Sequence, residues 1–553
     1  MPVIVVSRRD LERLVGRSLT YEEIFDYLTR LKCEVERIGE DVIEYEATHD
    51  RPDLFSVEGL ARAIRIMNGE KQSFEFIDEN IVFYNKGVPY RPYVAFAIVK
   101  NIVLDDEAIK QIMQLQEKLA SIYGRKRRKA SIGVYDFDKF KIPIYYELAD
   151  PMETRFIPLD YNEEMNLLEI LEKTEKGREF GWIIRDYDKY PILKSADNVV
   201  LSLAPILNSD YTKVTVNTRN VLIDSTGTDP KLVVDMVTVM ATSIAERSSD
   251  RRIYIVKTIG PGDLEITAPR TSSRKIEVPI SSISNVIGID IKLSDVIDYL
   301  NRSGYTHVDI VNDKLLVEPP IYRIDVINWI DIVEDIAIMH GFYEIGVEAE
   351  DLPHTSKPGR IHPLEFVTRK VRRFLANYGF IEAPSYMLSN RYQQIEMFEL
   401  DSELICVDNP KLEKYSCLRI WLTPGLLEVL VFNKVTSARI FEIGDVVGFK
   451  NPKSKSVEVE RRVGILITHD KATLTDGLVV LNTLFEEFGI KPTYKESQMK
   501  GFLSNRFVEV LLNNIYVGFA GEIHPSIIKK FGLENPVVVA EIILDRLLEK
   551  ISI

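Results

Sequence analysis

Four carboxylates lie close together in PPIYRIDVINWIDIVEDIAIMHGF, residues 319–342. Asp325 is followed by Asp331 six residues later, and then by Glu334 and Asp335. On a helix that starts near Asn328, the last three would share one face, because residues three and four apart are neighbours. Like charges on one face repel each other. The spacing therefore predicts either a cation among these acids or a solvated helix start whose acids complement the helix dipole.

A second polar cluster lies in NVLIDSTGTD, residues 220–229. We expect a strand that ends at Asp224, followed by a turn at residues 225–228. The residues alone leave two interpretations open. The Asp and Thr side chains can stabilise the turn as capping groups, or they can contact a ligand.

A third segment, YGRKRRKASIGVYDFDKF at residues 123–140, places five consecutive cations before an expected strand. A charge run of this kind usually lies on a solvated surface. It can also contact the phosphates of a nucleic acid.

The chain as a whole limits the possible functions. It has 553 residues, 45% of them hydrophobic, which is enough for three or four domains with sizeable cores. Its net charge of −14 argues against a protein that coats nucleic acid by bulk charge, although a local basic groove remains possible. The sequence has no Walker, Rossmann, HExxH or GxSxG motif, so general enzyme templates do not identify it.

The cysteines and the N-terminus indicate the cellular environment. Cys33, Cys406 and Cys417 form no CxxC pair, and we expect neither a disulfide framework nor a zinc site. The start MPVIVVSRRDLERLVG lacks a secretory apolar region, and no apolar run approaches 18 residues. We therefore expect a soluble intracellular protein.

Hydrophobic periodicity divides the chain into four segments. Residues 1–88 predict strand, helix and strand, with the helix over 18–38, and then a helix capped by Asp53 or Ser56 with an apolar stripe of Val57, Leu60, Ala61 and Ile64. Residues 89–268 are rich in β-branched runs and predict a mixed α+β domain around a sheet. Residues 269–346 hold the acidic helix. A Pro- and Gly-bearing linker at 348–363 leads into the last segment, 353–553.

Read together, these segments resemble the beta subunit of phenylalanyl-tRNA synthetase in its shorter archaeal and eukaryotic form. The resemblance covers essentially the whole chain in order. It rests on HDRPDLFSVEGLARAI (49–64), LAPILNSDYTKVTVNTRNVLIDSTGTD (203–229), YRIDVINWIDIVEDIAIMHGF (322–342), LTPGLLEVLVFNK (422–434), RIFEIGDVV (439–447) and VGFAGEIHPSIIKKFGL (517–533).

The resemblance implies a multidomain α+β protein. An N-terminal α+β domain (1–88) would precede a mixed α/β editing domain (89–268). A small α+β domain with the acidic helix (269–346) would follow, and then a class II synthetase-like antiparallel sheet with helices (353–553).

The resemblance also implies a function. The chain would be required for the ligation of phenylalanine to its tRNA, and it would hydrolyse tyrosine wrongly attached to that tRNA. The matching pocket positions are Leu203 as a wall, Asp224 and Thr226 as polar contacts to the tyrosine, and Asn208 and Thr212. The basic run would meet the tRNA through Arg125, Lys126, Arg127 and Arg128. Tyr135 stands where the family often has histidine.

The family's metal and partners follow from the same resemblance. Asp325, Asp331, Glu334 and Asp335 would hold Mg²⁺, shared with an alpha subunit, since Mg²⁺ prefers oxygen ligands. Asp335 is shorter than the family's usual Glu. We expect two alpha and two beta subunits in the cytoplasm, tRNA(Phe) as a partner, ATP and phenylalanine bound by the alpha subunit, and no membrane contact.

The last domain is expected to lack catalytic residues for adenylate formation. A class II site holds ATP with two arginines. Arg439 superficially resembles the first of these arginines. The late segment GFAGEIHPS, which corresponds to the motif of the second, has no arginine. We expect His524 to be structural. Two alternatives remain: a free-standing aminoacyl-tRNA hydrolase, and a non-catalytic tRNA-binding scaffold.

Overall fold

The computed structural model describes residues 1–553 except 72, 347–358, 452, 454 and 550–553. The chain divides into two compact units, Met1–Asp351 and Leu352–Ile553. Most of the expected linker at 348–363 lies outside the described residues. The first three predicted domains fall within the first unit, and their boundaries stay a prediction.

The N-terminal part of the first unit is a small antiparallel sheet with helices. Its strand order is β1-β3-β2. The elements are β1 (Val3–Ser7), α1 (Arg8–Val15), α2 (Tyr21–Arg30), β2 (Glu34–Ile38), β3 (Val42–Glu46) and α3 (Val57–Met67). The predicted stripe of α3 is confirmed, since all four of its residues are buried. Ser56 occupies the N-cap position, but its side chain makes no capping hydrogen bond.

The prediction of one helix over residues 18–38 is wrong. The helix α2 ends at Arg30, and Lys32 takes a left-handed φ of 61°. The following residues, CEVE at 33–36, alternate apolar and polar and run into β2, as a period of two favours. The structure also contains α1, which follows β1 directly and is capped by Ser7.

A large mixed sheet forms the centre of the first unit, as the β-branched runs predict. Its strand order is β12-β11-β10-β7-β4-β14-β5-β13-β6, with β15 beside β14. The strands are β4 (Glu75–Asn85), β5 (Tyr93–Val99), β6 (Ala130–Asp136), β7 (Ile144–Ala149), β10 (Tyr190–Ser195), β11 (Val200–Leu203), β12 (Leu207–Asn208), β13 (Val221–Gly227), β14 (Arg252–Ile259) and β15 (Glu265–Ala268).

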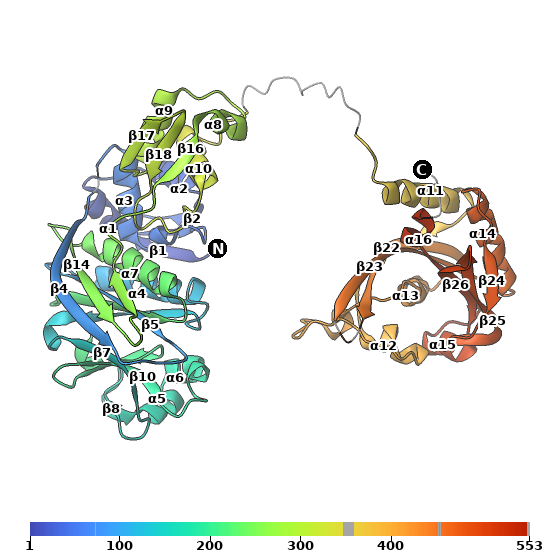
Figure 1. The fold of residues 1–553 in the computed structure, drawn as a ribbon, viewed down its shortest axis with the longest axis horizontal. Coiled ribbons are helices and arrows are strands. Elements are labelled where there is room, and N and C mark those ends of the chain that lie inside the picture. Colours follow the sequence, from blue (N-terminus) through green and yellow to red (C-terminus); the bar gives the residue numbers. More distant parts are fainter. Residues whose placement is uncertain (72, 347–358, 452, 454, 550–553) are drawn as a thin grey trace. The chain divides into compact units, whose positions relative to one another are not determined.

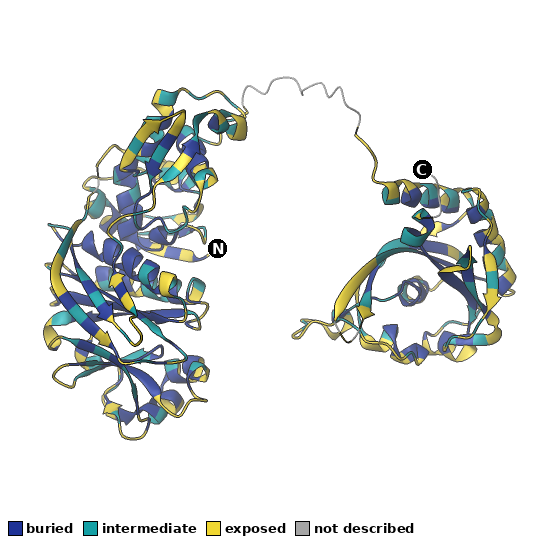
Figure 2. Ribbon diagram, in the orientation of Figure 1, coloured by how far each residue is buried: buried dark blue, intermediate teal, exposed yellow. Residues whose placement is uncertain are grey.

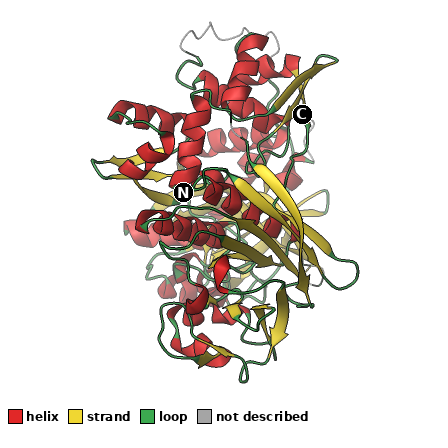
Figure 3. Cartoon of the chain, turned by 90° about the vertical axis from the view of Figure 1, so that its left-hand side faces the viewer, coloured by secondary structure: helices red, strands yellow, loops and turns green. Residues whose placement is uncertain are grey.

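Helices α4 (Asp106–Ile122) and α7 (Pro230–Ala245) cover one face of this sheet (Figures 1 and 3). The sheet also curls, so that strands from its two ends meet. The Asn208 side chain on β12 donates from Nδ2 to the Val134 carbonyl on β6 at 3.4 Å. The curl therefore brings together residues that lie far apart in the strand order.

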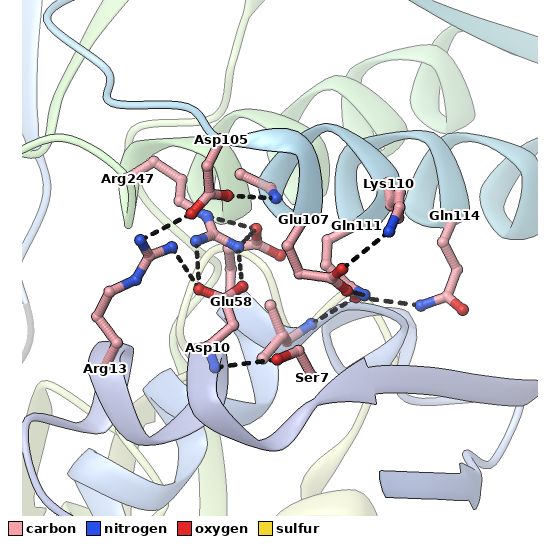
Figure 4. A network of polar contacts seen from close by, with 12 residues as sticks. Ser7, Asp10, Arg13, Glu58, Asp105, Glu107, Lys110, Gln111, Gln114 and Arg247 are labelled. Atoms are coloured by element: carbon pink, nitrogen blue, oxygen red, sulfur yellow. Dashed lines mark hydrogen bonds and ion pairs between the residues drawn. The ribbon is translucent and has the colours of Figure 1, made fainter. Parts of the chain in front are cut away.

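An ionic network, buried around Arg247 and exposed at Arg13, joins the N-terminal part to the large sheet (Figure 4). Arg247, just after α7, donates two hydrogen bonds to Asp10 on α1, at 2.9 and 2.7 Å, and one to Glu58 on α3, at 2.7 Å. Arg13 on α1 bonds Asp105, the N-cap of α4, at 2.8 Å. The two parts also share one hydrophobic core.

The acidic helix lies in a small domain around a three-stranded antiparallel sheet, β16-β18-β17. The elements are β16 (Ile276–Pro279), α8 (Ile280–Ile287), α9 (Leu293–Arg302), β17 (His307–Val311), β18 (Lys314–Glu318) and α10 (Trp329–His340). Asn328 is the N-cap of α10, so the predicted start of the acidic helix is confirmed.

The second unit is built on a largely antiparallel sheet, as predicted. The order is β19-β22-β23-β27-β26-β25-β24, and only β19 is parallel to its neighbour. The strands are β19 (Ile381–Glu382), β22 (Ala438–Asn451), β23 (Ser456–Thr468), β24 (Thr493–Glu496), β25 (Phe502–Leu512), β26 (Ile515–Ile523) and β27 (Val537–Ile543).

The sheet of the second unit curves around a helix. Helix α13 (Thr423–Asn433) lies within the curve; its first turns are buried, whereas its last three residues are exposed (Figures 1 and 2). Helices α11 (Pro363–Asn377), α14 (Leu474–Glu486) and α16 (Leu544–Leu548) pack with the sheet in a separate core.

The expectation that the cysteines form no disulfide is wrong. Cys406 and Cys417 are joined by a disulfide, while Cys33 is free and buried. An isolated β-bridge aligns Cys406 with Cys417, which starts the short strand β21 (Cys417–Leu418). The two cysteines are eleven positions apart in the sequence, and this local pairing of the chain places them together.

Candidate functional site

A cavity of about 540 Å³ lies where the two ends of the large sheet meet. Residues of β6 and β13 line one side, and residues of β11 and β12 line the other. Four of the five predicted pocket residues line this cavity: Leu203, Asn208, Thr212 and Asp224. The curl of the sheet thus creates the pocket.

Asp224 lies on β13 with its side chain almost fully buried, at 3% exposure. Its Oδ1 is 2.7 Å from the Tyr135 hydroxyl of the neighbouring strand β6. The predicted strand end at Asp224 is wrong, because β13 continues to Gly227 and pairs with β5 and β6 on both sides. The expected turn residues Ser225 and Thr226 are therefore part of the sheet.

Burial controls the protonation of Asp224. It raises the pKa of this carboxyl to about 7, while the Tyr135 hydrogen bond, the charge of Arg91 and the Gly133 amide act in the opposite direction. A carboxyl that titrates near neutral pH inside a cavity is typical of a functional site. The group can accept a hydrogen bond when ionised and donate one when protonated.

Thr226, two residues after Asp224 on β13, is buried and does not line the cavity. Its Oγ1 accepts a hydrogen bond from Nε of Arg91 at 2.9 Å and is 3.1 Å from Oγ of Ser131. Arg91 also donates to Ser131 at 3.0 Å, and of the two hydroxyls it is that of Ser131 that lines the cavity. Thr226 is therefore placed to orient Ser131. Its position does not favour the predicted contact between Thr226 and the substrate tyrosine.

Sequence reasoning missed the buried Arg91 altogether. Its guanidinium also donates to the main chain of Thr226 and Arg127. Burial lowers the pKa of Arg91 to about 10, so it stays charged at neutral pH. Arg91 lies in VPYRPYV, more than 30 residues before its partners, and this segment carries no motif that could have revealed the contact.

The remaining pocket residues form walls and fix the backbone. Leu203 on β11 is buried, and Asn208 bonds β6 as described. Thr212 donates to the Ser209 carbonyl at 3.3 Å. Of the described residues that line the cavity, none is a histidine or a cysteine, so the serine and threonine hydroxyls there have no imidazole base beside them.

The side chains of the basic run, residues 125–129, differ in their exposure to solvent. Arg125, Lys126 and Arg128 are exposed, but Arg127 turns inward and is buried. Arg127 donates to the carbonyls of Pro205 and Ile206, two residues of the cavity wall, and pairs with Glu117 at 2.8 Å. The predicted phosphate contact does not suit Arg127, because its charge is already used inside the protein.

Asp325 and Asp335 share a buried arginine. Arg323 lies 2.8 Å from Oδ2 of Asp325 and 2.9 Å from Oδ2 of Asp335. The Tyr305 hydroxyl also donates to Oδ2 of Asp335, at 2.7 Å. For Asp325 and Asp335, the cation beside the carboxylates is therefore the Arg323 side chain of the same chain.

The other two acids have separate partners. Asp331 Oδ2 accepts from the amides of Ile327 and Asn328 and completes a capping box at the start of α10. Glu334 pairs with Lys32 of the N-terminal part at 2.8 Å. Within the part of the chain that the structure describes, no group of three or more His, Cys, Asp or Glu residues could hold a metal ion. This donor set does not fit an ion held by this chain alone.

In the second unit, Arg439 is an exposed residue of β22. The late segment GFAGEIHPS forms the end of β26 and the start of α15 (Pro525–Lys530). The Nδ1 of His524 accepts from the Ser526 amide at 3.2 Å, which caps that helix. The described helices include none long and apolar enough to cross a membrane.

Comparison with known proteins gives consistent matches along the chain. Residues 108–257 match the B3/4 domain family, residues 276–342 the tRNA synthetase B5 domain, and residues 350–544 the phenylalanyl tRNA synthetase beta chain CLM domain. The chain is 37% identical over 549 residues to the phenylalanine–tRNA ligase beta subunit of Thermofilum pendens, covering 98% of this chain and 97% of the relative. It is 36% identical over 571 residues to that of Thermococcus onnurineus, covering 98% of both.

A solved structure agrees with these matches. The crystal structure of an N-terminal fragment of the phenylalanyl-tRNA synthetase beta subunit from Pyrococcus horikoshii is similar to this fold, with a TM-score of 0.59 and 38% identity. The similarity covers 62% of this chain and the whole of that fragment.

Proposed function

This chain belongs to the family of phenylalanine–tRNA ligase beta subunits, and on that premise we propose that its large cavity hydrolyses tyrosine wrongly attached to tRNA(Phe). As such a subunit it is part of an aminoacyl-tRNA synthetase, which joins phenylalanine to tRNA(Phe) and converts ATP to AMP and diphosphate. The proposed hydrolysis corrects an error of that reaction. A pocket that binds phenylalanine cannot strongly reject an isostere with one added hydroxyl.

The observation that carries the proposal is the combination of lining residues in the cavity. Its volume of about 540 Å³ can hold an aromatic side chain, Leu203 supplies an apolar wall, and Asp224 supplies a buried acceptor. A tyrosine phenol can donate to this carboxylate. Phenylalanine would leave the carboxylate without that partner, at a cost of about 1–3 kcal/mol, which is roughly one to two decades of discrimination.

The chemistry is ester hydrolysis by water. Water adds to the acyl carbon, the bond from that carbon to the ribose oxygen breaks, and the ribose oxygen takes a proton. The products are free tyrosine and intact tRNA. Since no histidine or cysteine is among the described lining residues, we propose that the pocket positions the ester and the water and does not form a covalent intermediate.

We propose an alpha subunit as the catalytic partner, which would bind ATP and phenylalanine. The second unit exposes large apolar side chains around a cavity of about 350 Å³, including Phe432 at 85% and Tyr386 at 75% exposure. Contiguous exposed apolar surface of this kind is typical of a protein interface. This surface favours a subunit over a free-standing hydrolase, and two alpha and two beta chains are the proposed assembly, in the cytoplasm.

Arg125, Lys126 and Arg128 are the proposed contacts to tRNA phosphates. We keep Mg²⁺ as a cofactor of the assembled ligase and do not assign it to this chain alone, because the four carboxylates near α10 already bind protein donors.

Deacylation by the assembled enzyme tests the proposal. Asp224→Ala should slow the hydrolysis of Tyr-tRNA(Phe) by at least tenfold and leave the formation of Phe-tRNA(Phe) near the parent rate. As a matched control, Asp250→Ala removes an aspartate outside the cavity and should change neither reaction. Parent-like hydrolysis of Tyr-tRNA(Phe) by the Asp224 variant would place the editing site elsewhere.

A further inference from the structure

The Tyr135 hydroxyl lies between two polar groups from opposite sides of the cavity. It is 2.7 Å from Oδ1 of Asp224 on β13 and 3.0 Å from Oγ of Ser202 on β11. In the strand order, β11 and β13 lie near opposite ends of the sheet. One phenol oxygen therefore connects both sides of the pocket.

The direction of these hydrogen bonds follows from the number of protons that each group can donate. A phenol has one proton, and an ionised carboxylate can only accept. Burial, together with the charge of Asp224, raises the pKa of Tyr135 well above its usual value, so the phenol keeps its proton at neutral pH. Tyr135 therefore donates to Asp224, and the Ser202 hydroxyl can donate to the phenol oxygen.

A glycine leaves the space that this contact needs. Gly133 on β6 is directly opposite Asp224 in the strand register. A Cβ at position 133 would lie 2.4 Å from both Asp224 Oδ1 and the Tyr135 hydroxyl oxygen. Any larger residue there would push the two groups apart, so the short contact depends on Gly133.

We infer that Tyr135 is a positioning residue for the tyrosine-ester hydrolysis proposed above, on which this inference rests. It holds the Asp224 carboxylate in place and links it to the opposite side of the pocket through Ser202. A carboxylate has acceptor capacity beyond one hydrogen bond, so Asp224 can bind Tyr135 and a substrate phenol together.

The inference predicts a pH effect, which depends on the charges around Asp224. Besides Tyr135, Arg91 in the segment ahead of β5 and Tyr146 on β7 interact electrostatically with Asp224. Other charged groups line the cavity: Glu117, Arg127, Asp160, Glu175, Lys176 and Lys213. Tyr135→Phe removes the donor and leaves all these groups, so the pKa of Asp224 should rise above about 7.

The test is the pH profile of Tyr-tRNA(Phe) hydrolysis by the assembled enzyme from pH 6 to 8.5. For the parent we expect kcat/KM to rise as Asp224 ionises, with a midpoint near 7. For Tyr135→Phe the midpoint should move up by about one pH unit, as expected when a charge-assisted hydrogen bond is lost. At pH 7 the rate should fall several-fold and recover at the upper end of the range.

Tyr45→Phe is the matched control, because it also removes a buried phenol hydrogen bond, 2.8 Å to the Leu54 carbonyl, in the N-terminal part. It should leave the midpoint unchanged. An unchanged midpoint in Tyr135→Phe, or an equal loss of rate at every pH, would overturn the inference.

Two further variants separate this inference from the proposed function. Gly133→Ala keeps every ionisable group and should shift the midpoint in the same direction as Tyr135→Phe. If Asp224→Ala hydrolyses Tyr-tRNA(Phe) like the parent, the proposed function itself fails. If Asp224→Ala is inactive while Tyr135→Phe and Gly133→Ala keep the parent midpoint, only the role of Tyr135 fails.

Discussion

The guanidinium of Arg127 donates a hydrogen bond to the main-chain carbonyl of Ile206, with 2.7 Å between Nη1 and the oxygen. The arginine comes from a run of five cations, and the carbonyl belongs to the wall of the large cavity. The same guanidinium lies 4.3 Å from the ring centre of Phe180. Two adjacent arginines in this run, Arg127 and Arg128, therefore have different surroundings, one buried and one exposed.

This difference can be measured with two single variants. Arg127→Ala should leave two carbonyls of the wall without their donor, lower the free energy of unfolding by about 2–4 kcal/mol and slow Tyr-tRNA(Phe) hydrolysis. Arg128→Ala should leave stability unchanged, weaken tRNA binding and reduce its salt dependence by about one counterion. Thermal unfolding and tRNA titrations at two salt concentrations check both. Equal effects of the two variants on stability would contradict the assignment.

The buried Asp224 predicts how stability depends on pH. Its folded-state pKa, about 7, lies above the unfolded value, so the folded state binds the proton more tightly. Stability should therefore fall as pH rises from about 4 to 7 and stay level above. Asp224→Asn cannot ionise, so its free energy of unfolding relative to the parent should improve by about 2 kcal/mol between pH 5 and 8. Urea unfolding at both pH values measures this. A difference that stays constant would show that Asp224 is not buried as described.

The acids near α10 should differ in their effect on stability. Asp335→Asn leaves the buried Arg323 undercompensated and should cost about 3–5 kcal/mol. Asp331→Ala removes the capping acceptor and should cost about 1 kcal/mol. Glu334→Gln, in an exposed pair, should cost less than about 1 kcal/mol. Thermal unfolding with and without EDTA checks the order, and EDTA should not lower the melting temperature of this chain. A loss on chelation comparable to that of Asp335→Asn would show a bound metal.

The chain by itself should not activate phenylalanine. The late segment of its class II-like unit has no arginine to neutralise a triphosphate, and the capping bond of His524 is structural. Phenylalanine-dependent exchange of diphosphate into ATP should appear only after the alpha subunit is added. Robust exchange by the purified chain would contradict this expectation.

The exposed aromatic residues of the second unit should bind the alpha subunit. Phe432→Ser combined with Tyr386→Ser should reduce copurification with the alpha subunit by at least tenfold, since buried aromatic residues often dominate interface energies. Trp182→Ser, which removes an exposed aromatic residue of the first unit, is the control and should leave assembly intact. Undiminished copurification of the double variant would place the interface elsewhere.

The sequence by itself determined the class of fold and the start of the acidic helix. The stripe at Val57, Leu60, Ala61 and Ile64 identified α3, because a helix with one buried face needs apolar residues at this spacing. Asn328 followed by acids indicated the start of α10 for a similarly local reason. Local patterns failed where the chain changes direction within a few residues, as at Lys32, where the predicted helix gives way to β2.

Only the tertiary structure decided which polar residues share a site. Tyr135, Ser202 and Asp224 come from three separate strands, and the pocket exists because the sheet curls until its ends meet. Arg91 reaches Thr226 across 135 residues of sequence. The same holds for the acidic helix, whose spacing left a bound cation and a solvated helix start open and could not identify Arg323 and Lys32 as partners of its acids. Sequence spacing limits contacts within one helix or strand, whereas contacts between elements depend on packing and burial, which no local pattern encodes.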